Sequence, residues 1–155
     1  MTTAYFDATA FVKLLFQEDG TEVAAALWDG SDIVVSSRVS HAEVTASIVE
    51  AGRLDLVAPR TLRQVRSAWD DYWAATRVVE LTEMVERAAA RLIATTSLGF
   101  LGALHVASAS AVGDRDLIVV TWDPEVGSAA TDAGLRRAPA GPADLADARD
   151  PARPT

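Results

Sequence analysis

Residues 117–123 read Leu-Ile-Val-Val-Thr-Trp-Asp: four apolar residues in a row, then a hydroxyl and, two positions later, a carboxylate. A short apolar run that is rich in β-branched residues is typical of a strand buried on both faces of a parallel sheet. Residues 33–35 (Ile-Val-Val) and residues 3–6, which end directly before Asp7, have the same character. These three runs predict the central strands of the fold.

Longer amphipathic stretches separate these strands and predict helices. We expect helices over residues 9–16, 21–28, 40–51, 59–73, 82–96, 101–112 and 124–133, and further short strands over residues 77–81 and 135–138. This alternation predicts an α/β fold, a mainly parallel central sheet with helices on both faces, in one domain over residues 1–138. Residues 139–155 contain four of the six prolines, so we expect a flexible Pro/Ala/Asp-rich tail there.

The composition excludes several classes of protein. The chain has 155 residues, no cysteine, and 14 Lys and Arg against 22 Asp and Glu, a net charge of −8. Without cysteine there are no disulfides, thiolate nucleophiles or Cys-ligated metal centres. No apolar run approaches the ~20 residues that cross a bilayer, and the first residues show no secretory signal pattern. We therefore expect a cytoplasmic protein without membrane association. The negative balance argues against nucleic-acid binding through a basic surface.

Candidate site residues follow the central strands. Ligands of open parallel sheets bind outside the carboxyl ends of the strands, which is where Asp7 and Asp123 lie, with the hydroxyls of Thr9 and Thr121 beside them. Glu43, near the start of the helix after the strand at 33–35, belongs to the same edge. Three carboxylates there suit Mg²⁺ or Mn²⁺. Such a site could activate water for phosphodiester cleavage.

Each of these acids also has a purely structural interpretation. An aspartate after a strand is often the N-cap of the next helix, and this applies to Asp7 and to Asp123. Ser40 and Glu43 fit the S-x-x-E capping box, in which the two side chains satisfy each other's backbone donors. The three acids are expected together at one edge, and this joint placement favours a metal site over three separate structural roles.

Other site chemistries find little support. No G-x-G-x-x-G follows a strand and no G-x-x-x-x-G-K-[ST] occurs, and Ser/His/Asp catalysis lacks a nucleophile elbow. An aspartate-based phosphotransferase needs a second aspartate close after the first, and Asp7 is followed by Ala8 and Thr9 instead. Of the two histidines, we expect His105 to be packed or hydrogen-bonded within its helix and His41 to be exposed.

Four segments, taken in order, resemble the motifs of PIN-domain proteins, in particular the VapC toxins of bacterial toxin–antitoxin pairs. Residues 5–13 resemble the opening D-x-[ST]-x-x-x-K, which places Lys13 in the pattern, and residues 36–44 resemble the second motif, with Glu43 as its acid. Residues 101–109 resemble the third, L-D-A-x-H-L-A-x-A, and residues 120–123 resemble the fourth, T-x-D. The resemblance covers residues 3–138. As the only lysine, Lys13 has an alternative interpretation as a solvated helix residue.

The resemblance implies a three-layer α/β/α sandwich whose acidic cluster binds Mg²⁺ or Mn²⁺ and cleaves RNA with metal-activated water. It implies catalytic and metal-binding roles for Asp7, Glu43 and Asp123, and supporting roles for Thr9 and Thr121. It also implies a homodimer and a small VapB-like antitoxin, with which the chain would form a heterotetramer or a larger complex. The acidity of the chain suits a basic inhibitory partner.

The third acidic position of the family is Gly102 in this chain. A missing carboxylate predicts weaker metal binding and impaired catalysis. Two explanations compete: an inactivated version of the protein, or a naturally degenerate site in which Asp114 or Asp116 substitutes. We favour an attenuated site, because both aspartates precede the strand at 117–121 and should lie at its opposite end. A catalytically silent PIN-fold protein that binds an antitoxin or another partner is the alternative function.

Three tryptophans and one tyrosine lie in predicted helices, Trp28, Trp69, Tyr72 and Trp73. They either line a groove or dimer face or pack in the core, and the sequence leaves both interpretations open.

Overall fold

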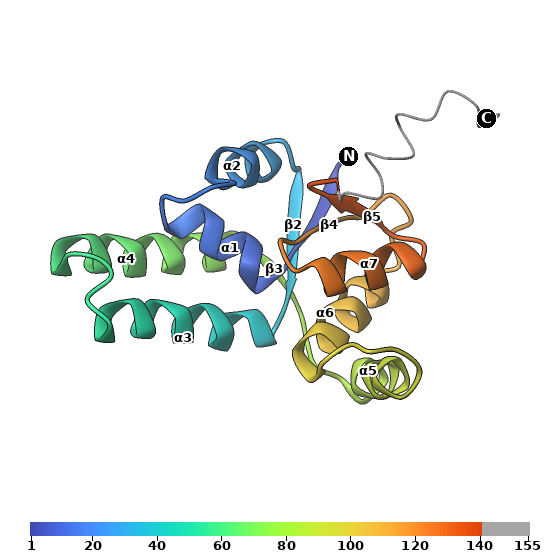
Figure 1. Ribbon diagram of the computed structural model, residues 1–155. Coiled ribbons are helices and arrows are strands. Elements are labelled where there is room, and N and C mark those ends of the chain that lie inside the picture. The colour runs from blue at the N-terminus through green and yellow to red at the C-terminus, as the bar shows by residue number, and fades with distance from the viewer. Residues whose placement is uncertain (141–155) are drawn as a thin grey trace, which may run out of the picture.

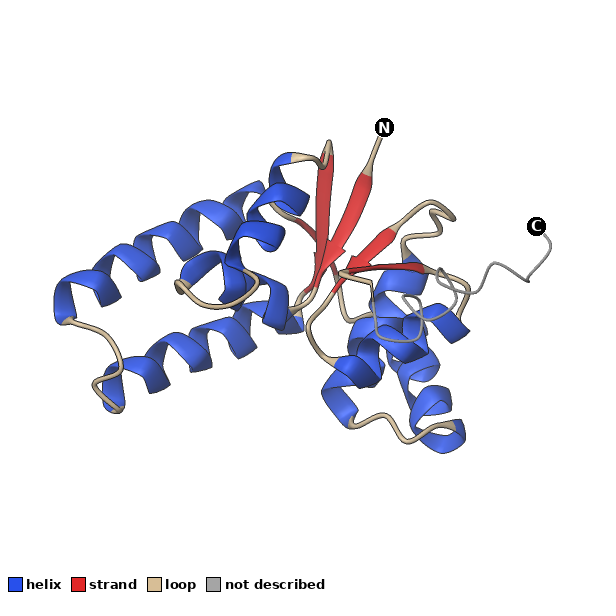
Figure 2. Cartoon of the chain, turned by 45° about the horizontal axis from the view of Figure 1, so that its top comes forward, coloured by secondary structure: helices blue, strands red, loops and turns tan. Residues whose placement is uncertain are grey.

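The computed structural model describes residues 1–140, which form a five-stranded sheet between two layers of helices (Figures 1 and 2). All neighbouring strands are parallel, in the order β3-β2-β1-β4-β5. The strands are β1 (Thr3–Phe6), β2 (Ile33–Ser37), β3 (Arg77–Val79), β4 (Ile118–Val120) and β5 (Arg136–Ala138). The predicted α/β/α sandwich with a mainly parallel sheet is confirmed.

Helices cover both faces of the sheet, as Figure 1 shows. The first layer contains α1 (Ala8–Leu15), α2 (Thr21–Asp29), α3 (Val39–Arg53) and α4 (Pro59–Ala75). The second contains α5 (Glu83–Thr95), α6 (Phe100–Ala111) and α7 (Pro124–Asp132). The predicted elements are all present, with shifts of a few residues at their ends.

The central strands are buried on both faces, as their apolar runs predict. Phe6 and Val120 pack with the α1–α4 layer, whereas their strand neighbours Tyr5 and Val119 belong to the core on the opposite side. Successive side chains of a strand point to opposite faces, so one strand contributes to both cores. These strands are therefore a rigid base for the residues that follow them.

The aromatic side chains of α2 and α4 mainly pack in the first core. Trp69 is buried, and Trp28, Tyr72 and Trp73 are partly buried against the same cluster. The ring of Trp69 lies 5.0 Å from that of Phe11, and the Trp28 and Tyr72 rings lie 4.7 Å apart. Core packing thus accounts for most of this aromatic surface.

The predicted capping box at the start of α3 is wrong. The N-cap position is Arg38, which makes no side-chain capping bond. Ser40 lies inside the helix, fully buried, where its hydroxyl accepts a hydrogen bond from the Ser36 hydroxyl at 2.7 Å. Tertiary burial of Ser40 replaces the local capping interaction, and this leaves Glu43 available for a distant partner.

Helix α3 continues past the predicted end at residue 51 and includes Gly52 and Arg53. A Cβ atom at Gly52 would lie 2.7 Å from Cδ2 of Leu62 in α4. The glycine therefore permits close packing of two helices rather than a helix stop.

The predicted tail at residues 139–155 lies almost entirely outside the described residues, which end at residue 140. Within residues 1–140, no helix has the length and apolar character needed to cross a membrane.

Candidate active site

The predicted site residues follow strands that end at one edge of the sheet. β1 lies between β2 and β4 and is parallel to both, so the carboxyl ends of the three strands come together. Asp7 directly follows β1, Thr121 directly follows β4, and Glu43 lies on α3, the helix that follows β2. The topology thus places these side chains as the strand pattern predicts.

Asp7 is buried at the centre of this edge, with an exposed fraction of 2%. Its Oδ1 accepts hydrogen bonds from the Thr9 hydroxyl at 2.6 Å and from the Ala10 backbone N–H at 3.0 Å, and its Oδ2 accepts one from the Thr121 hydroxyl. Burial raises the pKa of Asp7, although the charge of His105 and the hydroxyl hydrogen bonds oppose the rise. The carboxylate is therefore held in one orientation in a site that disfavours its charge.

The two threonines connect Asp7 to the segment that carries Asp123. Thr9 Oγ1 accepts a hydrogen bond from the Trp122 backbone N–H at 2.8 Å, and Thr121 Oγ1 accepts one from the Asp123 N–H at 3.0 Å. Both predicted supporting hydroxyls thus bind Asp7 on one side and the β4–α7 connection on the other. Their arrangement makes the two aspartates parts of one hydrogen-bonded unit.

Asp7 and Asp123 are also helix N-caps, as their alternative interpretation predicts. Asp7 caps α1, and Oδ1 of Asp123 accepts hydrogen bonds from the N–H groups of Glu125 at 2.8 Å and Val126 at 3.2 Å. The capping role fixes each carboxylate at a helix N-terminus, where the partial positive charge of the helix favours an anion. The structural and the functional interpretations are therefore compatible.

Glu43 is bonded to a buried histidine. His105 donates a hydrogen bond from Nε2 to Oε2 of Glu43 at 2.7 Å, and its Nδ1 lies 2.8 Å from the hydroxyl of Tyr5. Burial lowers the pKa of His105, but the bond to Glu43 and the charges of Asp7, Glu43 and Asp123 outweigh it, and the net shift is upward. All three predicted carboxylates thus act on one imidazole.

The prediction that His105 is packed or hydrogen-bonded is confirmed, but its central place is not evident from the sequence. Its partners lie 100 and 62 residues away along the chain. The one available signal is its place on α6, three residues after Gly102. The exposure predicted for His41 is confirmed, and its ring lies 5.2 Å from that of Trp73.

The carboxylates share an edge without forming a closed cage. Among residues 1–140, no group of three or more His, Asp or Glu side chains is arranged to hold a metal ion directly. Mg²⁺ is usually held by one or two carboxylates and keeps several waters, and carboxylate oxygens are the ligands it prefers. The donor set therefore fits a partly hydrated ion held by one or two of Asp7, Glu43 and Asp123.

Gly102, which the resemblance to the third motif aligns with an aspartate, lies on the first turn of α6. A Cβ atom there would lie 3.2 Å from Cδ2 of Leu98 and 3.3 Å from Cγ2 of Val126. The space beside the glycine is thus already filled by apolar side chains. Asp114 and Asp116 precede β4 and so lie at the opposite edge from Asp7. They are therefore not placed to substitute for a carboxylate at position 102.

The alternative interpretation of Lys13 as a solvated helix residue is wrong. Its side chain is only 18% exposed and its ammonium lies 3.3 Å from a Glu18 carboxylate oxygen. The same ammonium lies 5.9 Å from the centre of the Trp122 ring. Lys13 therefore ties α1 to the β4–α7 connection.

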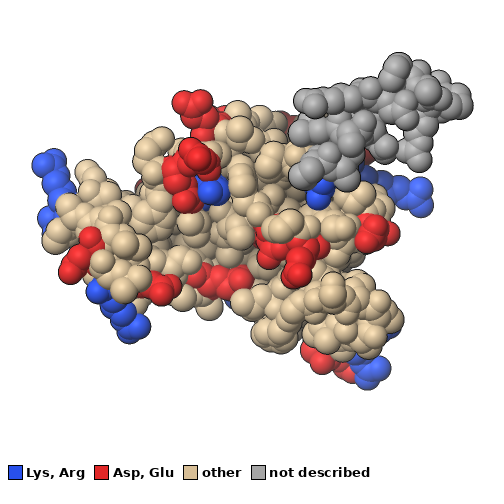
Figure 3. All heavy atoms as spheres, in the orientation of Figure 1, with Lys and Arg blue, Asp and Glu red and all other residues tan. Residues whose placement is uncertain are grey.

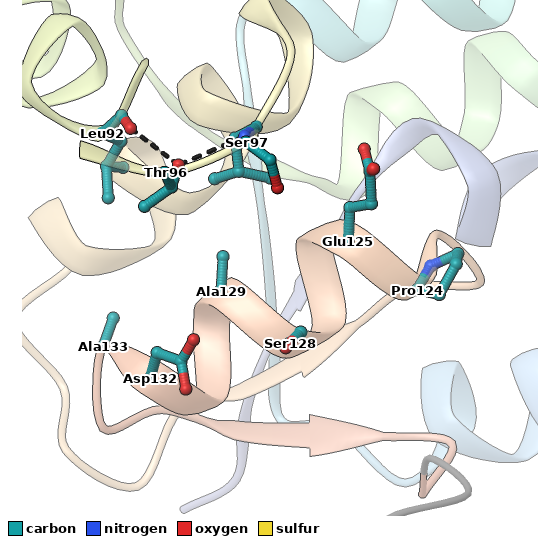
Figure 4. Close-up of a pocket in the computed structure, with 10 residues that line it drawn as sticks. Leu92, Thr96, Ser97, Pro124, Glu125, Ser128, Ala129, Asp132 and Ala133 are labelled. Carbon is teal, nitrogen blue, oxygen red and sulfur yellow. Dashed lines mark hydrogen bonds between the residues drawn. The ribbon is translucent and has the colours of Figure 1, made fainter. Parts of the chain in front are cut away.

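The surface has two further features. Acidic side chains gather over the middle of the face drawn in Figure 3, whereas most Lys and Arg side chains lie towards its ends. A hollow of about 420 Å³ lies between the α5–α6 connection and α7, and Figure 4 shows Ser97 and Glu125 on its two walls. Glu125 is two residues from Asp123, but Asp7, Glu43 and Asp123 do not line this hollow.

Comparison with known proteins identifies the family. Residues 4–130 match the PIN domain. Over 140 residues, the chain is 46% identical to Ribonuclease VapC45 and to Ribonuclease VapC49, each from a strain of Mycobacterium tuberculosis, and each match covers 90% of this chain and 97% of the relative.

Solved structures share the fold at low sequence identity. VapC20 of Mycobacterium tuberculosis, described as a sarcin-ricin loop cleaving toxin, has a TM-score of 0.61 at 17% identity and covers 81% of this chain and 94% of its own. VapBC2 of Rickettsia felis, bound to a promoter DNA fragment, has a TM-score of 0.62 at 12% identity, with coverages of 88% and 97%. The chain belongs to the PIN-domain family, among its VapC-type members.

Proposed function

We propose that this chain is the toxin of a type II toxin–antitoxin system, an endoribonuclease that depends on Mg²⁺ or Mn²⁺. The observation that supports it most is the hydrogen-bonded unit at the carboxyl edge of the sheet, in which Thr9 and Thr121 fix Asp7 beside Asp123. The identity of 46% to two ribonucleases over almost their whole length supports the same activity.

Each side chain of the site has a definite task in this proposal. One or two of Asp7, Asp123 and Glu43 would hold the divalent ion directly, and the rest would contact it through its waters. The ion, when bound, supplies Lewis acidity towards the scissile phosphate and its attacking water. Thr9 and Thr121 orient the Asp7 carboxylate through their hydroxyls. The N-terminus of α7, which Asp123 caps, adds partial positive charge where a phosphate would approach.

The glycine at position 102 attenuates this activity in our proposal. It contributes no ligand, and Leu98 and Val126 fill the space next to it. The same observation favours the second candidate function, a catalytically silent PIN-fold protein that binds an antitoxin or another protein.

The partners follow from the fold and the charge. Structural neighbours include VapBC2 of Rickettsia felis and a toxin–antitoxin complex from Klebsiella pneumoniae, and a basic VapB-like antitoxin would complement the net charge of −8. We also propose a cytoplasmic homodimer, which the antitoxin extends to a heterotetramer or larger complex. Exposed apolar side chains on α5 and α6 supply area for such contacts, namely Met84, Ile93, Phe100 and Leu101.

Position 102 offers the sharpest test of this function. RNA cleavage with Mg²⁺ or Mn²⁺ would be measured for the unmodified chain, for Gly102→Asp, and for Gly102→Ala as the control that adds a Cβ without a carboxylate. We expect Gly102→Asp to raise the cleavage rate by about tenfold or more, which corresponds to ~1.4 kcal/mol in the barrier, and Gly102→Ala to give no gain.

A double variant, Gly102→Asp with Asp7→Ala, decides the site. It should lose the cleavage gained by Gly102→Asp. Cleavage that survives the loss of Asp7 would contradict the site assignment. The remaining outcome is that neither the unmodified chain nor a folded Gly102→Asp variant cleaves RNA with Mg²⁺ or with Mn²⁺. That result would favour the second candidate function, a catalytically silent binding protein.

A further inference from the structure

One imidazole connects the core of the sheet to the Glu43 carboxylate. His105 is 4% exposed, Tyr5 is fully buried, and the two rings meet edge to face at 6.0 Å and 78°. The two nitrogens of His105 lie at hydrogen-bond distance from Glu43 and from Tyr5, at 2.7 and 2.8 Å. A ring bonded at both nitrogens cannot turn without breaking both bonds.

The bond to Glu43 fixes which nitrogen carries a proton. An ionised carboxylate only accepts, so Nε2 of His105 carries the proton that it donates to Oε2. The hydroxyl of Tyr5 is the partner of Nδ1, at 2.8 Å. Tyr5 lies in β1 between two neighbouring strands. The His105 ring is therefore anchored to the middle strand of the sheet.

The His105 ring, held by Tyr5, restricts the orientation of the Glu43 side chain. Its side chain is 20% exposed and extends from the second turn of α3, and the predicted local partner at Ser40 is occupied by Ser36. A free glutamate side chain loses rotamer freedom when it is ordered, and this loss opposes ion binding. A hydrogen bond from His105 imposes that order before any ion binds.

We propose that Tyr5 and His105 are positioning residues, which hold the Glu43 carboxylate at the edge of the sheet where it can bind a divalent ion. The inference rests on the proposed function, because it assigns Glu43 to that ion. With Gly102 in place of an acid, few carboxylates remain, so the orientation of each one has a larger effect on affinity. Loss of a hydrogen-bond partner of a metal ligand typically weakens metal binding about 10–100-fold.

The test measures Mn²⁺ affinity of the full-length chain by calorimetric titration. His105→Asn has a side chain too short to reach Glu43, whereas the amide nitrogen of His105→Gln comes close to the position of Nε2. We expect His105→Asn to bind Mn²⁺ at least about tenfold more weakly than the unmodified chain and His105→Gln to recover most of the loss. Tyr5→Phe removes only the remote hydroxyl, and we expect it to lower the affinity by a smaller factor.

Val106→Ala is the matched control, because Val106 is buried in the same helix but belongs to the core cluster with Val85 and Leu104. It should lower the melting temperature and leave Mn²⁺ affinity unchanged. Equal losses in His105→Asn and His105→Gln, or a comparable loss in Val106→Ala, would show that His105 acts only through stability and would overturn the proposal.

The imidazole NMR signal of His105 gives a readout without metal. We expect an Nε2–H proton protected from exchange with solvent in the unmodified chain, and faster exchange in both Glu43→Ala and Tyr5→Phe. If the unmodified chain binds no Mn²⁺ but shows this pattern, the metal dependence fails while the positioning of Glu43 stands. Exchange that is unchanged in both variants rejects the positioning itself.

Discussion

Asp7 is the residue at which stability and function oppose each other. Burial raises its pKa, so at neutral pH the folded chain holds a carboxylate whose charge its surroundings disfavour. A pKa raised by folding stabilises the protein at low pH and costs stability as the pH rises through the folded value. In the proposed function, a bound divalent ion would offset this cost.

We therefore expect Asp7→Asn to raise the melting temperature of the chelator-treated protein at pH 7. The free energy of unfolding should increase by ~1.4 kcal/mol for each pKa unit of the shift that is relieved. The gain should shrink as the pH falls through the folded pKa of Asp7, because the native carboxyl is then neutral too. Thermal unfolding of both proteins at a series of pH values between about 4 and 8 measures this. A lower melting temperature for Asp7→Asn at pH 7 would contradict the argument.

At the scale of elements, the sequence predicts the strands and helices that follow from the local pattern of apolar residues. The buried strands at β1, β2 and β4 follow from short apolar runs, and the edge with Asp7 and Asp123 follows from the parallel topology. The capping box at Ser40 is wrong because the helix starts earlier, so Ser40 lies inside it, where its buried hydroxyl bonds to Ser36. The bond between His105 and Glu43 joins residues 62 positions apart, and no local pattern encodes it.

The double role of Asp123 as N-cap and candidate ligand gives a prediction at this scale. Asp123→Ala should cost about 1 kcal/mol in the free energy of unfolding, because two N–H groups of α7 lose their acceptor. Asp123→Asn keeps a good N-cap and should change stability by only a few tenths of a kcal/mol. Both variants should weaken Mn²⁺ binding, since both remove the charge.

Thr82→Ala is the matched control, because Thr82 caps α5 away from the site. It should lose stability by an amount similar to Asp123→Ala and keep its Mn²⁺ affinity. Chemical denaturation and metal titration of the three variants measure both effects. If Asp123→Asn binds Mn²⁺ as well as the unmodified chain, Asp123 is a cap only.

At the scale of the whole molecule, the charge requires an explanation. A net charge of −8, with acidic side chains over the middle of one face, repels the phosphates of RNA. Proteins that bind nucleic acid usually supply Lys and Arg for these contacts, and here Lys13 is already paired with Glu18. A divalent ion at the carboxyl edge would supply positive charge where the backbone has to approach.

RNA affinity should therefore depend on the divalent ion rather than on general electrostatics. At constant ionic strength, we expect fluorescence anisotropy to show at least about tenfold tighter binding of a short RNA with Mg²⁺ than with EDTA, a difference of ~1.4 kcal/mol. Asp123→Asn should lose this dependence. Glu86→Gln, which removes an equal charge from the exposed surface of α5, should keep it. Equal affinity with and without Mg²⁺ would mean that RNA reaches another surface, because charge at the carboxyl edge would then have no effect on the approach of the backbone.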